Sequence, residues 1–322
     1  MNEAPKRTPY LQMIDGVPRT PLVKPEVYRE ASRFKPTAGD VILITHPKSG
    51  THWVTQIVLL ILNKGQSPRD LADLARQAPF IEVNGVGHSE RPPRLLRTHL
   101  PFGRLQYNEE ARYIYVARNP YDTCVSFYPH VKGLPQFRFQ DGTFEDFVDA
   151  FINGRIGHGD QLEHVLSGYA KRHQPNVFFL TYEGLKADTA RTVLELAKFL
   201  GEPYATMFER ENSLMDEILL KSSVGYMKKM LEVNPEELPV IYNHPPQPPD
   251  VEAELLKIRS GPRAACNVRN GTSGDWRSHF TPELLERMEA WIGENTRGSD
   301  LMGLWGREFT ASKLTQPLTS AA

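Results

Sequence analysis

Four short apolar runs punctuate the first two thirds of the chain. They are Val41–Thr45, Leu95–Thr98, Tyr113–Ala117 and Val177–Thr181. Short apolar runs without polar alternation are typical of strands that are buried on both faces, as in a parallel sheet. We therefore expect four buried parallel strands.

Helical patterns alternate with these runs. Trp53–Asn63 follows the first strand, and Thr143–Asn153 begins with Thr143 as N-cap. Asp188–Leu200 precedes Gly201, a residue typical of helix C-termini. Thr281-Pro282 places an N-cap before a proline at the first helical position, so a helix is expected from there to about residue 291. This order predicts an α/β fold with three layers, α/β/α, around a central parallel sheet.

The remaining segments suggest how the domain is bounded. Residues 1–38 are rich in proline and charge and are expected to form an N-terminal surface segment. Residues 39–310 are expected to form a single domain, and 311–322 a flexible C-terminal tail. Within the domain, 233–250 contains a run of prolines that disfavours helix and central strand. A loop of this length is either disordered or a functional lid, and we favour a lid.

Composition narrows the class of protein. The chain has 322 residues, of which 40% are hydrophobic and 24% charged, as in ordinary globular proteins. The net charge of −1 gives no indication of a nucleic-acid or membrane partner. The two cysteines, Cys124 and Cys266, suggest a reducing compartment without disulfides. Because neither a signal peptide nor a membrane span is recognisable, we expect a cytoplasmic protein. The histidines show no metal-ligand spacing, so no metal is expected.

The most informative segment lies between the first strand and its helix, at His46–Trp53. A loop there directs free backbone N–H groups and the positive end of the helix dipole at one point. Gly50 allows an anion to approach the backbone, and Lys48 adds a positive charge. The segment is P-loop-like and predicts a site for a phosphate ester or a related anion. It is not a Walker A loop, because Lys48 precedes Gly50 instead of following it, which disfavours an ordinary kinase.

Two further segments have the character of anion sites. Arg118 begins one at a strand end, with Ser126 about two helical turns further on. The other runs from Arg269 to Gly274 and combines arginine, glycines and hydroxyls. Either could, alone, be a plain surface turn. Three such segments on one chain fit a ligand with two separated anionic groups, such as a nucleotide with phosphates at two positions.

These motifs, in their order and spacing from about residue 40 to 290, resemble those of the cytosolic sulfotransferases, which use 3′-phosphoadenosine 5′-phosphosulfate (PAPS) as sulfuryl donor. The resemblance rests on Pro47–Thr51 with Trp53, Arg97–Pro101, Ala117–Pro120 with Asp122 and Val125-Ser126, Tyr182-Glu183, and Arg269, Gly271 and Gly274–Trp276 with Phe280-Thr281.

The resemblance implies roles for individual residues. His99 is similar to the general base, and Lys48 to the cation that stabilises the leaving phosphate. Trp53 and Tyr182 are similar to residues that contact the adenine of the donor; the alternatives are that Trp53 is a core residue and that Tyr182 only ends a strand. The residues that the resemblance assigns to donor binding are Lys48, Ser49, Gly50, Thr51, His52, Trp53, Arg118, Ser126, Tyr182, Ser222, Ser223, Val224, Met227, Arg269, Asn270 and Gly271.

The acceptor side matches the family less well. The resemblance implies a small alcohol, phenol or amine, with Phe80, Arg97 and Phe102 beside it. Lysine is common in the family where Arg97 stands, and Gly157–Leu162 lacks the usual aromatic residues. The C-terminal dimer motif is altered, so a homodimer stays open. Alternatives to a sulfotransferase are a P-loop-type nucleotide kinase and a nucleotide-binding protein without catalysis.

Overall fold

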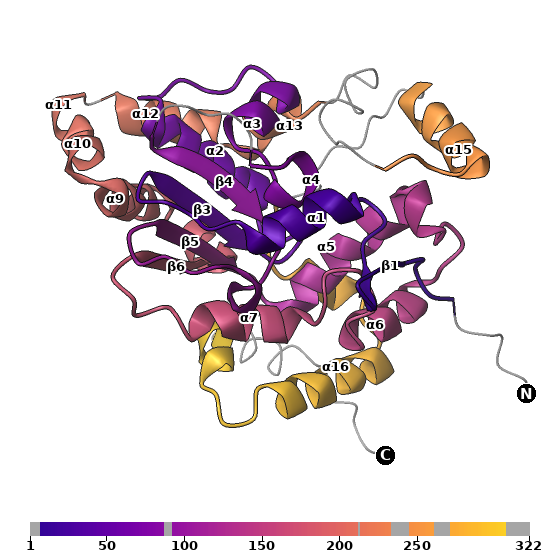
Figure 1. Ribbon diagram of the computed structural model, residues 1–322. Coiled ribbons are helices and arrows are strands. Elements are labelled where there is room, and N and C mark those ends of the chain that lie inside the picture. The colour runs from indigo at the N-terminus through magenta and orange to yellow at the C-terminus, as the bar shows by residue number, and fades with distance from the viewer. Residues whose placement is uncertain (1–6, 87–91, 212, 233–244, 261–270, 307–322) are drawn as a thin grey trace, which may run out of the picture.

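The protein is described by a computed structural model that covers residues 7–86, 92–211, 213–232, 245–260 and 271–306 (Figure 1). A four-stranded parallel sheet lies at its centre in the order β4-β3-β5-β6. The strands are β3 (Asp40–Thr45), β4 (Arg94–Thr98), β5 (Arg112–Ala117) and β6 (Val177–Thr181). The four strands expected from the apolar runs are confirmed. The register places Ile42 between Leu96 of β4 and Tyr113 of β5.

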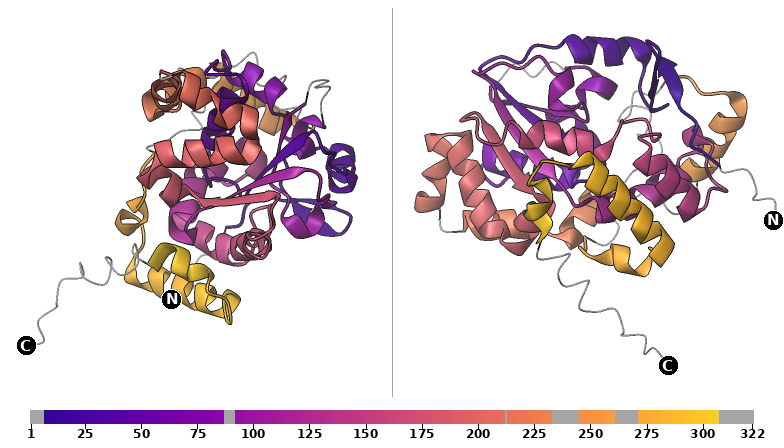
Figure 2. Two further views of the ribbon diagram at one scale, coloured as in Figure 1. Left: turned by 90° about the vertical axis from the view of Figure 1, so that its left-hand side faces the viewer. Right: turned by 90° about the horizontal axis from the view of Figure 1, so that it is seen from below.

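Side chains of β3 alternate between two hydrophobic cores, one on each face of the sheet. Ile42 and Ile44 join one core, whereas Val41 and Leu43 join the other. The first face is covered by α5 (Pro120–Gly133), α6 (Phe144–Ile152), α7 (Gln161–Tyr169) and α16 (Pro282–Asn295). The second is covered by α2 (Thr51–Leu62), α3 (Leu71–Gln77), α9 (Thr189–Leu200), α12 (Leu214–Lys221) and α13 (Val224–Met230). The three layers expected from the sequence are visible in Figure 2.

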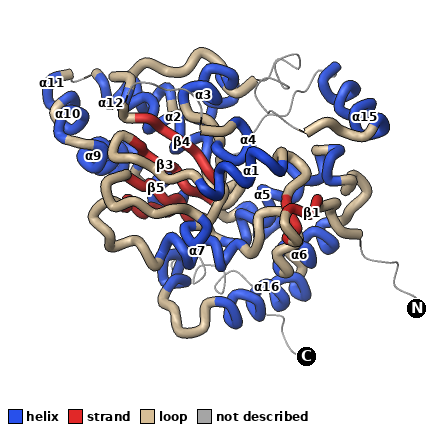
Figure 3. Tube along the Cα trace, viewed as in Figure 1, coloured by secondary structure: helices blue, strands red, loops and turns tan. Residues whose placement is uncertain are grey.

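The described residues include further helices and turns, which Figure 3 colours by secondary structure. The remaining helices are α1 (Pro25–Arg33), α4 (Ile81–Asn84), α8 (Tyr182–Ala187), α10 (Glu202–Ala205), α11 (Met207–Arg210) and α15 (Pro249–Ser260). Single 3-10 turns lie at Phe102–Arg104, Pro135–Phe137, Asp275–Ser278 and Leu301–Trp305. Among the described residues, no helix has both the length and the apolar character that crossing a membrane requires.

The helix ends follow the expected caps closely. The Thr143 side chain accepts the Asp146 N–H and completes a capping box at the start of α6. The Asp188 side chain accepts the backbone N–H of Arg191 at the start of α9. At the start of α16, Thr281 accepts the backbone N–H of Leu284. Two boundaries differ from expectation, since α2 begins at Thr51 rather than Trp53 and α16 continues to Asn295.

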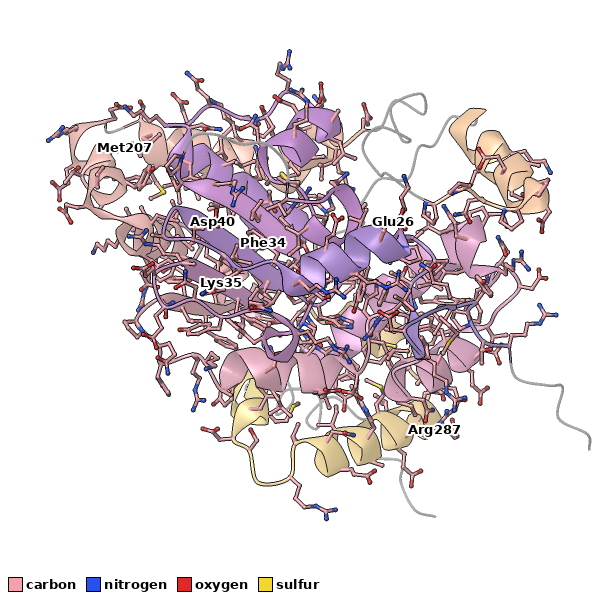
Figure 4. The ribbon with its side chains drawn as sticks, viewed as in Figure 1. Glu26, Phe34, Lys35, Asp40, Met207 and Arg287 are labelled. Atoms are coloured by element: carbon pink, nitrogen blue, oxygen red, sulfur yellow. The ribbon has the colours of Figure 1, made fainter. Side chains whose placement is uncertain are left out.

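The N-terminal segment has more structure than expected. Strands β1 (Gln12–Ile14) and β2 (Val17–Arg19) form an antiparallel hairpin, and α1 follows it across the outside of the molecule (Figure 1). Asp40, labelled in Figure 4, pairs with Arg94 at 2.8 Å at the start of the sheet. The guanidinium of Arg94 lies 5.7 Å from the Phe34 ring centre, which attaches the end of α1 to β4.

The proline-rich stretch 233–250 is described only in part. Residues 233–244 lie outside the described residues, as do 1–6 and 307–322, and the expectations of a lid there and of a flexible tail at 311–322 stay predictions. The expectation that the proline run contains no helix is wrong at its end. Pro249 begins α15. The first position of a helix tolerates proline because its N–H would have no intrahelical partner.

Candidate active site

The first anion segment forms a tight turn between β3 and α2, at the carboxyl edge of the sheet. Lys48 and Gly50 both have left-handed backbones, with φ of 68° and 97°. Gly50 is the N-cap of α2 and supplies no side-chain acceptor to the first turn. Ser49 is buried, and its hydroxyl has no hydrogen-bond partner among the described residues. The turn thus presents helix N–H groups and a hydroxyl that suit an anion.

Arg118 connects this turn to the ends of the next two strands. Its guanidinium donates to the carbonyl of Lys48 at 2.8 Å and to that of Thr272 at 3.3 Å. The same group lies 4.3 Å from the centre of the Tyr182 ring, at the end of β6. Three segments that are far apart in sequence therefore meet at one point.

Tyr182 also closes the space around Gly50. A Cβ atom on Gly50 would lie 2.7 Å from Cδ2 of Tyr182, so no larger residue fits without a shift. The Trp53 ring lies 5.4 Å from the Tyr182 ring at an angle of 66°. Trp53 is only half-buried, and its Nε1 has no partner among the described residues. The turn between β3 and α2, here called the anion turn, therefore has beside it an aromatic pair whose tryptophan N–H has no partner among the described residues.

The third anion segment is held against α5 by a carboxylate. Oδ2 of Asp122 accepts the N–H of Gly274 at 2.8 Å, and Oδ1 accepts that of Trp276 at 3.4 Å. Gly271 packs against Val224, whose Cγ2 would lie 2.6 Å from a Cβ at position 271. Two of the donor-binding candidates, Arg269 and Asn270, lie outside the described residues.

The other donor-binding candidates have mainly structural contacts in this protein. Ser126 is half-buried on α5, and His52 is half-buried in the first turn of α2. Ser222 is buried at the end of α12, and Ser223 caps α13 by accepting the N–H of Tyr226. Met227 is buried in the core. Contact of these residues with a donor stays a prediction.

His99 stands at the end of β4, beside the anion turn. Its Nδ1 lies 2.7 Å from the carbonyl oxygen of Thr45. A carbonyl can only accept, so the hydrogen-bond network assigns the proton to Nδ1 and leaves the lone pair on Nε2. The Thr45 hydroxyl also lies 2.7 Å from that of Thr51, the first residue of α2. His99 is thus attached through Thr45 to the start of α2.

The surroundings keep His99 neutral. Desolvation lowers its pKa from 6.5 to about 4, and the positive charges of Arg97 and Lys48 act in the same direction. The hydrogen bond to Thr45 opposes this shift without cancelling it. At neutral pH, His99 therefore has a free base nitrogen.

The three acceptor-side candidates differ in their positions. The Phe80 ring lies 4.7 Å from the His99 ring and forms a wall beside it. Arg97 is buried, donates to the carbonyl of Ala78 at 2.5 Å and lies 4.2 Å from the Phe80 ring centre, so it supports that wall. Phe102 packs into the core between Tyr113 and Tyr115.

A narrow pocket of about 50 Å³ opens beside His99. Much of its lining is polar or charged. The lining residues are Arg19, Thr20, Val23, Tyr28, Glu82, His99, Leu100, Pro101, Arg104, Gly157, His158, Gly159, Asp160, Glu163 and His164. Within the described residues, no group of histidine, cysteine and carboxylate side chains has an arrangement that could hold a metal ion.

Comparison with known proteins decides the family. Residues 38–300 match the family model described as the sulfotransferase domain. The chain belongs to the sulfotransferase family. The resemblance noted in the sequence is therefore confirmed, and with it sulfuryl transfer as the reaction of the family.

Individual relatives show the extent of this similarity. Human sulfotransferase 1E1 is 32% identical over 285 residues, which cover 83% of this chain and 87% of the relative. Bovine sulfotransferase 1E1 is 28% identical over 288 residues, covering 86% and 90%. Among solved structures, mouse sulfotransferase SULT7A1 complexed with PAP aligns with a TM-score of 0.68 at 23% identity, covering 94% of this chain and 99% of that one. Retinol dehydratase, in complex with androsterone and the inactive cofactor PAP, aligns with a TM-score of 0.68 at 21% identity, covering 92% and 89%.

Sequence reasoning missed the residues that hold His99 in this sulfotransferase. Oε1 of the buried Glu82 accepts the backbone N–H of His99 at 2.5 Å. Nε2 of His164 lies 3.2 Å from the His99 carbonyl, and its Nδ1 lies 2.7 Å from the Tyr115 hydroxyl. Burial raises the Glu82 pKa to about 7. The sequence signal for these residues was their position alone: Glu82 follows Phe80 by two residues, and His164 follows the segment Gly157–Leu162 by two residues.

Proposed function

We propose that this sulfotransferase transfers a sulfuryl group from PAPS to a hydroxyl or amine of a small molecule, with His99 as general base. The observation that carries the proposal is the position of neutral His99. Its Nε2 carries a free lone pair, and Thr45 attaches the ring to the start of α2, next to the anion turn. Base and anion site therefore share one edge of the sheet, where ligands of such folds bind.

The donor would lie across the three anion segments. The turn at Lys48–Thr51 would bind the 5′-phosphosulfate, and Arg118, Ser126 and Arg269–Gly271 the 3′-phosphate. The pair of Trp53 and Tyr182 would contact the adenine, with the residues at the start of α13 closing over it. Support comes from Arg118, which contacts both the anion turn and the third segment. PAP is bound in the two solved structures named above.

In the reaction, Nε2 of His99 would take the proton of the acceptor hydroxyl as its oxygen attacks the sulfur. The bond between sulfur and the bridging oxygen of the 5′-phosphate breaks, and Lys48 stabilises the charge that develops there. Desolvation and the positive charges of Arg97 and Lys48 hold the His99 pKa at about 4. Negative charge bound beside Lys48 would raise that pKa towards the working range, where a base is most effective.

A donor-selectivity experiment tests the proposal. Purified protein is heated with 3′-phosphoadenosine 5′-phosphate (PAP), ATP or adenosine 5′-phosphate at matched concentrations. A ligand that binds only the folded state raises the melting temperature. PAP should give the largest shift, because only it carries phosphates at both positions. An equal or larger shift with ATP would replace the proposal by the nucleotide-kinase alternative.

A further inference from the structure

A buried guanidinium forms part of the pocket beside His99. Arg19, at the end of β2, is 6% exposed, and its Nε has no hydrogen-bond partner among the described residues. Its pKa lies below the usual value, because loss of water outweighs the attraction of Tyr28 and Glu163. A buried cation is costly unless an anion compensates it.

A second guanidinium, that of Arg104, lines the same pocket. Arg104 lowers the pKa of Arg19 by its charge, and both interact with Tyr28. Cζ of Arg19 lies 5.2 Å from the Tyr28 ring centre. Arg104 itself is exposed, at the rim of the pocket. Two guanidinium groups in the lining of one pocket provide several N–H donors for a carboxylate.

The acidic residues of the pocket do not neutralise the charges of Arg19 and Arg104. Asp160 is engaged elsewhere, since Oδ2 accepts from Trp291 Nε1 at 2.9 Å and Oδ1 from the Glu163 N–H at 2.9 Å. Glu163 is exposed. Burial raises the pKa of Glu82 to about 7, so this carboxyl is partly protonated at neutral pH. The buried part of the pocket therefore has positive character.

The position of Arg19 is fixed by its neighbour in the chain. The N–H of Thr20 donates to the carbonyl of Gly157 at 3.1 Å. Gly157 has φ of 90°, and a Cβ there would lie 2.5 Å from the Thr20 nitrogen. The loop that follows carries His158, whose ring lies 5.4 Å from that of His99. The end of the N-terminal hairpin is thus fastened to the wall of the acceptor side.

We propose that the acceptor of this enzyme carries a carboxylate in addition to its hydroxyl, and that Arg19 with Arg104 binds this carboxylate while the hydroxyl faces His99. The proposal rests on the proposed function for the place of the hydroxyl. The carboxylate site rests only on Arg19, Arg104 and their surroundings. The substrate class is therefore small hydroxylated carboxylic acids, such as phenolic acids.

The test compares three small phenols that differ in one end group: 4-hydroxyphenylacetate, 4-ethylphenol and tyramine. Their affinities are measured by calorimetry for the protein alone and for the protein saturated with PAP, so that no turnover is needed. The carboxylate should bind at least about tenfold more tightly than 4-ethylphenol, the range expected for a charge-assisted hydrogen bond. A preference for 4-ethylphenol or tyramine, or no binding of the carboxylate, would overturn the proposal.

Variants connect this preference to the arginines. Arg19→Gln should weaken binding of 4-hydroxyphenylacetate about tenfold or more and that of 4-ethylphenol less than about threefold. Arg19→Lys should retain part of the preference because it keeps the charge. Arg104→Gln should act in the same direction with a smaller effect, because its charge is exposed. Arg33→Gln, an exposed arginine at the end of α1, serves as control and should change neither affinity.

The outcomes separate the two proposals. An unchanged preference for the carboxylate in Arg19→Gln and Arg104→Gln would contradict the arginine site. Failure of PAP to bind would instead contradict the proposed function, and the measurements on the protein alone would still test the carboxylate site. If Arg19→Gln does not fold, the Arg104→Gln variant decides the question.

Discussion

At the scale of single residues, the proposed base and the groups that fix its position are different residues. His99 lines the pocket, while the Thr45 carbonyl accepts from its Nδ1 and Glu82 and His164 contact its backbone. The local motif predicted His99 and Lys48 because both lie in short segments with recognisable neighbours. It could not predict Arg19 or Glu82 as partners of the site, because their contacts depend on segments far away in sequence.

His99→Ala tests the role of the base. A positioned general base contributes about 10²–10⁴-fold in rate. We expect kcat to fall by that factor, with the affinity for PAP nearly unchanged, in a sulfation assay combined with calorimetry. His173→Ala is the control, because it removes an exposed imidazole that precedes the amino end of β6, whereas His99 follows the carboxyl end of β4. Retention of more than a tenth of the wild-type kcat, with chemistry rate-limiting, would require another base.

Arg118→Ala tests donor binding. The guanidinium contacts the anion turn and the third segment, so its loss should weaken PAP binding by roughly 1.5–3 kcal/mol. Arg191→Ala removes only a surface ion pair and is the matched control. Calorimetry measures both. Equal PAP affinities in the two variants would show that Arg118 has a structural role only.

At the scale of elements, the continuous apolar runs predicted all four strands of the sheet, and the cap residues Thr143 and Thr281 predicted the starts of α6 and α16. The hairpin β1-β2 was missed because strands of three residues are too short to show a pattern. Helix α15 was missed because the prolines before it hid its start, although Pro249 suits the first helical position.

Two glycines with left-handed backbones allow a matched test of the anion turn. Gly50 has φ of 97° and Tyr182 against it, whereas Gly16 has φ of 77° and open space around it. Gly16→Ala should cost about 1–2 kcal/mol of unfolding free energy from backbone strain alone. Gly50→Ala should cost more and should also weaken PAP binding, because Tyr182 must move. Denaturant unfolding and calorimetry would contradict this account if the two variants behaved alike.

At the scale of the whole molecule, the alternation of strands and helices predicted the three layers, but not the strand order. The order places β3 and β5 side by side, and this adjacency brings Arg118 to the turn after β3. Long-range features of this kind follow from how the layers pack. Another example is the contact of Arg287, labelled in Figure 4, with Asp149 between α16 and α6.

Buried and half-buried histidines make the stability of the protein depend on pH. The pKa values of five are depressed below 6.5 by burial, namely those of His46, His52, His99, His158 and His164. Between about pH 4 and 6.5 the unfolded chain binds protons that the folded protein does not, so stability falls as pH falls through this window. Glu82 changes stability in the opposite direction. Its pKa is raised to about 7, so its contribution to folding stability is lost as pH rises from 4.5 through 7.

Urea unfolding of wild type and Glu82→Gln at pH 5 and pH 8 measures both effects. The unfolding free energy of wild type should be lower at pH 5 than at pH 8 by at least about 1 kcal/mol, which is the energy of a one-unit shift in pKa. Glutamine stays neutral at both pH values. The difference in unfolding free energy between Glu82→Gln and wild type should therefore shift in favour of the variant from pH 5 to pH 8. Equal wild-type stability at the two pH values would contradict the burial of these histidines.

The central claim is sulfuryl transfer from PAPS with His99 as base. Wild type and His99→Ala are incubated with PAPS carrying labelled sulfur and with a panel of phenols, alcohols and amines that includes hydroxy acids. Wild type should form labelled product and release one PAP for each sulfuryl group transferred, and His99→Ala should form at least about a hundredfold less. The absence of labelled product from the whole panel despite bound PAPS, or equal labelling by the two proteins, would contradict the account.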